Sequence, residues 1–300
     1  MSKIKGPVFR SPRGPLDRDN LCFYDSYCQR ISRWPFILQD DKRLPFQGIF
    51  LKSFCKLEVP DKLFLVVPPM KKENKKRVGI LGGSFDPVHN GHIGLATQVL
   101  EKFHLDHILF IPAYISPHKW DKKPTSASHR LAMLQLATAS WPFFLISEME
   151  LARKEVSFTI DTLAALLSEQ PETDFYLIMG MDAFQGIGTW KAVRQLLESC
   201  HVIVAARPGY STRGIEETLK NIFHDSPAPY LPAARDRNVL TFCHREKKTR
   251  LYIFDLPPIH ISSSQIREKI RTHQEVKNML PPEVENYIMQ NQLYRTKTYP

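Results

Sequence analysis

Short apolar runs alternate with amphipathic segments along the chain from residue 78 onward. The apolar runs have the length of buried strands, and they lie at Val78–Leu81, His107–Ile111, Phe143–Ser147, Phe175–Met179, His201–Ala205 and Tyr252–Phe254. Between them, apolar residues recur every three or four positions, which predicts helices at 89–103, 160–168 and 193–197 and helices that begin at Ser128, Ser263 and Glu283. This alternation favours an α/β fold, a doubly wound, Rossmann-like parallel sheet with helices on both faces. Ligands of such sheets bind beyond the carboxyl ends of the strands.

The first quarter of the chain follows a different pattern. Residues 1–76 contain many prolines and scattered aromatic residues without a helix or strand period, and they end in the basic run Lys71–Arg77. Residues 211–250 are polar and predict no clear elements. We therefore expect a basic, partly ordered N-terminal extension, residues 1–76, followed by one α/β domain, residues 77–300.

Charge separates the two regions further. Residues 1–77 hold 17 Lys and Arg against 8 Asp and Glu, so nearly all of the net charge of +10 belongs to this quarter. We favour a basic extension without a macromolecular partner. The alternative is an arm that contacts nucleic acid or another polyanion, and only this extension makes nucleic acid a candidate.

Composition is that of a soluble protein, with 43% hydrophobic and 24% charged residues. The five cysteines are odd in number and lack C-x-x-C spacing, which favours free thiols in a reducing, cytoplasmic compartment. No apolar run approaches the ~18 residues of a transmembrane helix, so no membrane partner is expected. Asp17 and Asp19 lie in the first 20 residues, where a signal peptide would have an apolar core. The sequence leaves open whether the chain forms a homo-oligomer.

The clearest chemical pattern follows the first predicted strand. Gly82 and Gly83 allow the backbone to approach a ligand closely, and the next helix directs free N–H groups and its positive dipole end at an anion. His89 and His92 are three positions apart, so both imidazoles can reach one phosphoryl group. The glycines do not form the G-x-G-x-x-G of a dinucleotide fold, and the histidine pair lacks the further ligands of a zinc site. The pattern predicts a phosphate at a helix N-terminus.

A second helix start, Ile261–Arg267, has a related composition. Ser262 and Gln265 have the spacing of a capping box. Free N–H groups at this start, together with the guanidinium of Arg267, can clamp a polyphosphate.

These two stretches resemble the HxGH and ISSxxxR signatures of the nucleotidyltransferase superfamily. Other stretches resemble bacterial nicotinate-nucleotide adenylyltransferases, and they occur in family order between Val78 and Arg295. They are Ser116–Lys119, His129–Met133, Ser157–Leu163, Gly180–Ala183, Trp190–Lys191, Arg207–Gly209 and Leu293–Tyr294.

The resemblance implies transfer of the adenylyl group of ATP to nicotinate mononucleotide, which gives nicotinate adenine dinucleotide and pyrophosphate in NAD biosynthesis. It implies the catalytic residues His89, His92, Lys119 and Arg267. It implies ATP contacts from Gly82, Gly83, Ser84, Phe85, His89, His92, Asp182, Arg207, Ser263, Ser264 and Arg267. It implies nicotinate mononucleotide contacts from Ser84, Lys119, Thr159 and Trp190. Mg²⁺ is expected on the phosphates of ATP, with no dedicated protein metal site.

Several alternatives remain beside this hypothesis. The acceptor can be nicotinamide mononucleotide or phosphopantetheine, although Ser157–Leu163 and Trp190 argue against phosphopantetheine. The chain can also be a non-catalytic nucleotide-binding protein of the same fold. Structural roles are open too: Trp190 as a core residue, and Asp182 and Thr159 as helix caps. Lys191 stands where the family often has a second aromatic residue.

Overall fold

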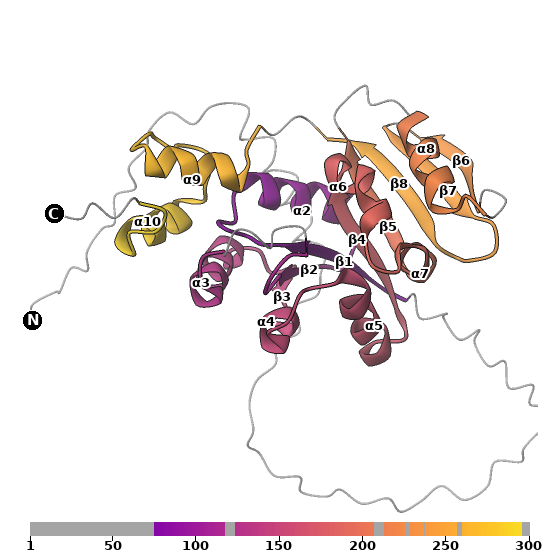
Figure 1. Ribbon diagram of the computed structural model, residues 1–300, viewed down its shortest axis with the longest axis horizontal. Coiled ribbons are helices and arrows are strands. Elements are labelled where there is room, and N and C mark those ends of the chain that lie inside the picture. The colour runs from indigo at the N-terminus through magenta and orange to yellow at the C-terminus, as the bar shows by residue number, and fades with distance from the viewer. Residues whose placement is uncertain are drawn as a thin grey trace, which may run out of the picture. The chain divides into compact units, whose positions relative to one another are not determined.

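The computed structural model describes residues 75–117, 124–206, 213–225, 229–236, 238–256 and 260–295. Within these ranges one sheet carries the fold (Figure 1). Its strands, in spatial order, are β3 (Phe144–Ile146), β2 (His107–Pro112), β1 (Lys76–Gly83), β4 (Thr173–Gly180), β5 (His201–Ala206), β8 (Arg250–Asp255), β7 (Val239–His244) and β6 (Tyr230–Asp236).

The strand order creates a crevice between β1 and β4. Both β2 and β4 pair with β1 in parallel, and Val78 lies opposite His107 on one side and Phe175 on the other. The chain runs outward from β1 through β2 to β3 and then returns to the other side of β1 for β4, β5 and β8. The connections therefore diverge at β1 and β4, and ligands of doubly wound sheets bind at such a switch point.

Helices cover both faces of the sheet, which confirms the predicted fold class. On one face a buried cluster unites Leu81, Ile108 and Ile178 with the apolar sides of α2 (Asn90–Lys102), α3 (Ala127–Thr138), α9 (Ser263–Arg271) and α10 (Pro282–Gln290). On the other face a second cluster unites Ile80, Leu177 and Val204 with α5 (Thr159–Glu169), α6 (Met181–Gln185), α7 (Val193–Ser199) and α8 (Arg213–Ile222). Ile80 and Leu81 thus face opposite sides, as the alternation of a strand requires.

One glycine of β1 is required by close packing. A Cβ at Gly79 would lie 2.7 Å from a methyl carbon of Ile108 and 2.8 Å from one of Ile178. Such distances are too short for carbon atoms, so a larger residue here would push β1 away from its neighbours.

The polar stretch 211–250, which predicted no elements, contains α8 and two strands. β6 and β7 pair with each other and with β8 in antiparallel fashion, so they extend the parallel sheet at one edge. β6 shows almost no burial alternation because it is an exposed edge strand, and Pro232 beside a register irregularity fits an edge position. Three short helices also lack a clear sequence period: α4 (Met149–Arg153), α6 and the 3-10 turn η1 (Ile187–Thr189). In the described residues, no helix has the length and apolar character needed to cross a membrane.

Candidate active site

The two histidines of the first motif stack on each other at the start of α2. His89 is the N-cap of this helix, with extended backbone angles, and His92 is its third residue. Their ring centroids are 3.7 Å apart. The backbone N–H of His89 donates to Nδ1 of His92 at 3.2 Å. Because Nδ1 of His92 accepts this bond, the proton of the neutral ring is on Nε2, which is the nitrogen that can donate to a ligand.

His89 is buried and uncharged. Its side chain is 6% exposed, and its Nδ1 has no hydrogen-bond partner among the described residues. Burial lowers the pKa of the imidazole from 6.5 to about 4. A buried nitrogen without a partner is costly, so its presence beside a helix N-terminus points to a ligand that completes it.

The glycine turn, residues 82–89, leaves open space at its centre. A Cβ at Gly82 would meet no atom within 4 Å, whereas one at Gly83 would lie 3.2 Å from the ring of Phe85. Phe85 has a positive φ of 47° and a side chain that is 1% exposed. Its ring lies edge-on to the ring of His92, with the two centroids 5.0 Å apart, and so packs against the histidine pair. Because the side chain is buried, only the backbone of Phe85 is available to a ligand.

The second motif packs directly on this turn. The hydroxyl of Ser263 donates to the carbonyl oxygen of Pro87 at 2.9 Å, and Nη1 of Arg267 donates to that of Asp86 at 2.6 Å. Nη2 of Arg267 also donates to the hydroxyl of Ser264 at 3.2 Å. Ser262 caps α9 by accepting the N–H of Gln265, as its spacing predicts. The structure therefore joins two helix N-termini that are far apart in the sequence.

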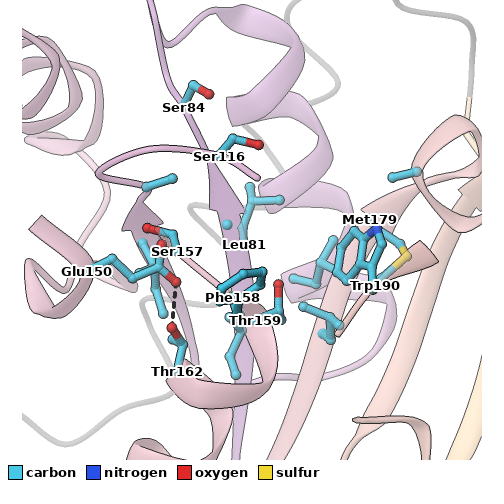
Figure 2. Close-up of a pocket in the computed structure, with 18 of the residues that line it drawn as sticks. Leu81, Ser84, Ser116, Glu150, Ser157, Phe158, Thr159, Thr162, Met179 and Trp190 are labelled. Carbon is cyan, nitrogen blue, oxygen red and sulfur yellow. Dashed lines mark hydrogen bonds between the residues drawn. The ribbon is translucent and has the colours of Figure 1, made fainter. Parts of the chain in front are cut away.

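A cavity of about 360 Å³ opens beside the glycine turn at the carboxyl ends of β1 and β4 (Figure 2). Its lining includes Gly82, Gly83, Ser84 and His92 from the first motif. Thr159 and Trp190 line it as well. Trp190 also packs against the buried cluster that contains Ile80 and Leu177, so its packing role and its access to the cavity coexist. The cavity thus brings the predicted acceptor side together with the predicted phosphate side.

The proposed capping roles of two residues are wrong. α5 begins at Thr159 itself, and Phe158 is its N-cap, so Thr159 cannot cap the helix. α6 begins at Met181 with Gly180 as N-cap, and Asp182 lies exposed in the first turn. Asp182 is outside the lining of the cavity, although Gly180 contributes to it.

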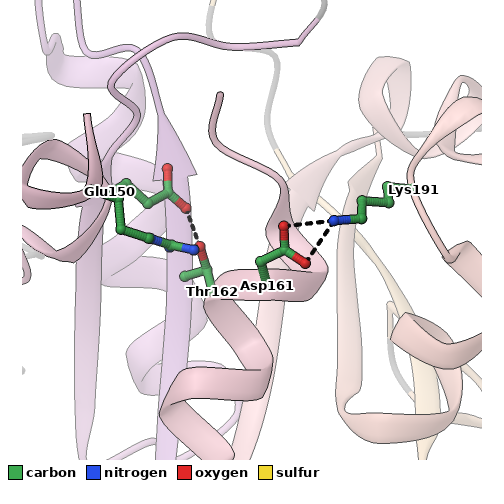
Figure 3. A network of polar contacts seen from close by, with 5 residues as sticks. Glu150, Asp161, Thr162 and Lys191 are labelled. Carbon is green, nitrogen blue, oxygen red and sulfur yellow. Dashed lines mark hydrogen bonds and ion pairs between the residues drawn. The ribbon is translucent and has the colours of Figure 1, made fainter. Parts of the chain in front are cut away.

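Polar side chains form two groups next to α5 (Figure 3). The hydroxyl of Thr162 donates to Oε1 of the buried Glu150 at 2.6 Å and accepts a bond from Arg153. Nζ of Lys191 lies 2.8 and 2.9 Å from the two carboxylate oxygens of Asp161, and 4.8 Å from the ring centroid of Phe158. Both Glu150 and Lys191 line the cavity, so it presents one anionic and one cationic side chain.

Sequence reasoning gave Arg130 no role, yet it is the largest fully buried side chain near the site. It is 1% exposed and donates to the carbonyl oxygens of Ser84 at 2.7 Å, Thr125 at 3.0 Å and Tyr114 at 3.3 Å. Burial lowers the pKa of its guanidinium, and the nearby Asp86 opposes that effect. The signal was present, because an arginine stands on the apolar side of a predicted helix, where it needs internal partners.

Two predicted residues, Lys119 and Arg207, lie outside the described residues. Within the described ranges, no group of three or more His, Cys, Asp or Glu side chains has an arrangement that could hold a metal ion. Cys200 and Cys243 are free thiols.

Two helix N-termini that meet at a topological switch point, with a buried histidine nitrogen without a partner, form a site for positioning phosphates. The Cytidylyltransferase-like family profile matches residues 80–269, so the fold is that of a nucleotidyltransferase. A relative from Moorella thermoacetica is 38% identical over 222 residues, which are 74% of this chain and 93% of the relative. One from a Synechococcus strain is 36% identical over 73% of this chain and 95% of its own length. Both are named probable nicotinate-nucleotide adenylyltransferases, and the chain belongs to that enzyme family.

Solved structures agree on the fold. The nicotinic acid mononucleotide adenylyltransferase of Plasmodium falciparum, complexed with NaAD, superposes with a TM-score of 0.55 at 21% identity. The match covers 73% of this chain and 97% of that one. The same protein complexed with APC gives a TM-score of 0.54 at 20% identity, with the same coverage.

Proposed function

We propose that this protein transfers the adenylyl group of ATP to nicotinate mononucleotide and releases nicotinate adenine dinucleotide and pyrophosphate, a step of NAD biosynthesis. The single observation that carries this proposal is that the Ser263 motif packs on the glycine turn, whose residues Gly82, Gly83 and Ser84 line one cavity. One side of the cavity suits phosphates and the other suits a flat aromatic ring. Family membership with relatives that match over nearly their whole length supports the same reaction.

The reaction needs alignment and charge neutralisation more than covalent chemistry from the protein. An oxygen of the acceptor 5′-phosphate attacks the α-phosphorus of ATP, and the bond from that phosphorus to the β-phosphate oxygen breaks as pyrophosphate leaves. Nε2–H of His92 would donate to the phosphate that gains charge in the transition state. The buried, neutral His89 would gain a proton or a hydrogen bond when an anion arrives, because an adjacent negative charge raises its pKa.

On the donor side, ATP would contact two groups of residues. The first is Gly82, Gly83, Ser84 and the backbone of Phe85, and the second is Ser263, Ser264 and Arg267. Asp182 would contact its ribose. Lys119 and Arg207 are assigned to phosphate and nucleotide contacts by their family motifs alone.

On the acceptor side, the ring of Trp190 offers a face for the pyridine. No side chain caps α5, because its N-cap residue is Phe158. The first N–H groups of α5, that of Thr159 included, are therefore suited to the nicotinate carboxylate. The second aromatic residue that the family often has is absent, because Lys191 occupies that position.

We infer that Mg²⁺ arrives with ATP and neutralises charge on its phosphates. The acid within the glycine turn, Asp86, is not placed to ligate the ion, because both of its carboxylate oxygens have hydrogen-bond partners. The phosphates of ATP would therefore hold Mg²⁺, and the described residues would bind the phosphates. We further propose a cytoplasmic enzyme, which free thiols at Cys200 and Cys243 support, and a separate extension at residues 1–76.

One assay tests the function. The full chain is incubated with ATP, Mg²⁺ and, separately, nicotinate mononucleotide, nicotinamide mononucleotide or phosphopantetheine, and pyrophosphate and product are quantified. We expect turnover with nicotinate mononucleotide, a loss of about 100-fold or more in His92→Ala, and normal turnover in His104→Asn, which changes an exposed histidine. Turnover with nicotinamide mononucleotide or phosphopantetheine alone would reject nicotinate mononucleotide as the acceptor. No turnover at all would favour a nucleotide-binding protein.

A further inference from the structure

Contacts from three distant segments hold the backbone of the glycine turn and the residue that follows it, Asn90. Arg130 in α3 holds the carbonyl of Ser84, while Arg267 and Ser263 in α9 hold those of Asp86 and Pro87. At the end of the turn, the backbone N–H of Asn90 donates to Met279 and its side-chain amide to Asn278, both to carbonyl oxygens at 2.9 Å. The turn is thus held by α3, by α9 and by residues 278 and 279.

Asp86 is the unexpected residue of this turn. A carboxylate three residues before His89 would repel the phosphates of a nucleotide if it faced them. Instead it is 7% exposed, and both of its oxygens have partners. Oδ1 accepts from the hydroxyl of Tyr294 at 2.7 Å, and Oδ2 accepts from the backbone N–H of Thr125 at 3.2 Å.

Tyr294 reaches this position from the end of the described chain, beyond α10. Burial and the charge of Asp86 both raise the pKa of its hydroxyl, so it remains a donor across the working pH range. The charge of Asp86 opposes the effect of burial on the pKa of Arg130, so the carboxylate and the guanidinium lie close enough to interact. Asn278 therefore contacts Asn90, directly after the glycine turn, and Tyr294 contacts Asp86 within it.

We propose that Asp86 and Tyr294 are positioning residues for the transfer reaction and that Asn278, Met279 and Tyr294 hold the glycine turn in its phosphate-binding shape. The proposal rests on the function proposed above. Removal of the Tyr294 hydroxyl frees Oδ1 of Asp86, which lets the carboxylate turn toward solvent and the phosphates. The histidine pair at the end of the same turn then loses alignment with the α-phosphorus, where small displacements cost rate steeply.

The test compares two variants that each lose one hydroxyl from the same C-terminal segment. Tyr294→Phe breaks the bond to Asp86. Tyr287→Phe breaks a bond of 2.9 Å to Nδ1 of His129 and leaves the glycine turn untouched. We expect Tyr294→Phe to lower kcat about 10-fold and to raise the KM for ATP, with the acceptor KM within about 2-fold of wild type. We expect Tyr287→Phe to keep kcat within about 2-fold.

A kcat within 2-fold of wild type in Tyr294→Phe overturns the proposal, as do equal losses in both variants. Asp86→Asn tests the same contact from the turn, because an amide has one oxygen and cannot accept from both Thr125 and Tyr294 as the carboxylate does. We expect the same split between kcat and acceptor KM. If the wild-type chain shows no turnover, the proposed reaction fails, but calorimetric ATP binding still tests the positioning role. Tyr294→Phe should then weaken ATP binding several-fold, and unchanged binding contradicts the role.

Discussion

Mild acid should destabilise the folded chain through His89. Burial lowers the pKa of this imidazole from 6.5 to about 4, so the folded state disfavours its charged form. A lowered pKa contributes stability that is fully present above pH 6.5 and is lost as the pH falls toward 4. One pKa unit corresponds to 1.36 kcal/mol, so moving from pH 7.5 to pH 5 should remove about 2 kcal/mol of unfolding free energy at this residue.

His201 acts in the same pH window. Burial lowers its pKa to about 4 as well, with opposing effects from Asp174 and reinforcing effects from Arg250 and Arg77. Its ring stacks on Tyr176 at the start of β5, at the opposite end of the sheet strands from the glycine turn. Because this ring is partly exposed, solvent screens part of the effect, and we expect a smaller, additive loss of about 1 kcal/mol.

The assay is urea unfolding of wild type, His89→Asn and His104→Asn at pH 7.5 and pH 5. Asparagine is a good N-cap and has no titration in this range, so His89→Asn should lose about 2 kcal/mol less than wild type between the two pH values. The exposed His104 should give the wild-type difference. An unchanged pH dependence in His89→Asn would refute the burial of a neutral imidazole at this position.

Three further predictions concern the same site. Arg130→Leu removes the donors of three part-buried carbonyl oxygens and should lower the unfolding free energy by about 3 kcal/mol in urea. A loss below about 1 kcal/mol would contradict the role assigned to the guanidinium. ATP binding should take up protons near pH 6, because a phosphate beside His89 raises the lowered pKa of this imidazole. Calorimetry in buffers of different ionisation enthalpy measures this uptake, and equal heats in all buffers would contradict the prediction. Lys191→Met breaks the half-exposed ion pair with Asp161, so it should change the unfolding free energy by less than about 1 kcal/mol. The KM should rise for nicotinate mononucleotide, which has a carboxylate, and stay constant for nicotinamide mononucleotide, which has an amide.

The parallel part of the fold could be predicted because its strands are buried on both faces. Such strands are continuous apolar runs, and β1, β2, β4 and β5 each extend the predicted run by one to four residues. β6 could not be predicted in this way, because seven residues with one buried side chain leave no apolar signal. Its pairing with β7 depends on a register that only the folded sheet supplies.

For the candidate site, sequence identified the residues whose types carry chemistry and missed those that act through geometry. Histidines, glycines and a serine-rich helix start are visible as patterns. Asp86 and Tyr294 are 208 positions apart and meet only through the packing of α10, so no local period connects them. Arg130 was hidden for a similar reason, since its three acceptors are backbone carbonyls and a sequence does not display which carbonyls are buried.

The contacts of Arg130 and Ser263 explain how side chains can prepare a backbone site. In a trans peptide unit the carbonyl and the N–H point in opposite directions. Arg130 and Ser263 hold the carbonyls of Ser84 and Pro87, and this fixes the N–H groups of Phe85 and Val88 on the other side of the turn. A preset backbone donor needs no rearrangement when charge develops on a phosphate, which is the property that favours catalysis. Ser263, which sequence assigns to ATP, and Arg130, which it does not, therefore both act on the glycine turn before any nucleotide arrives.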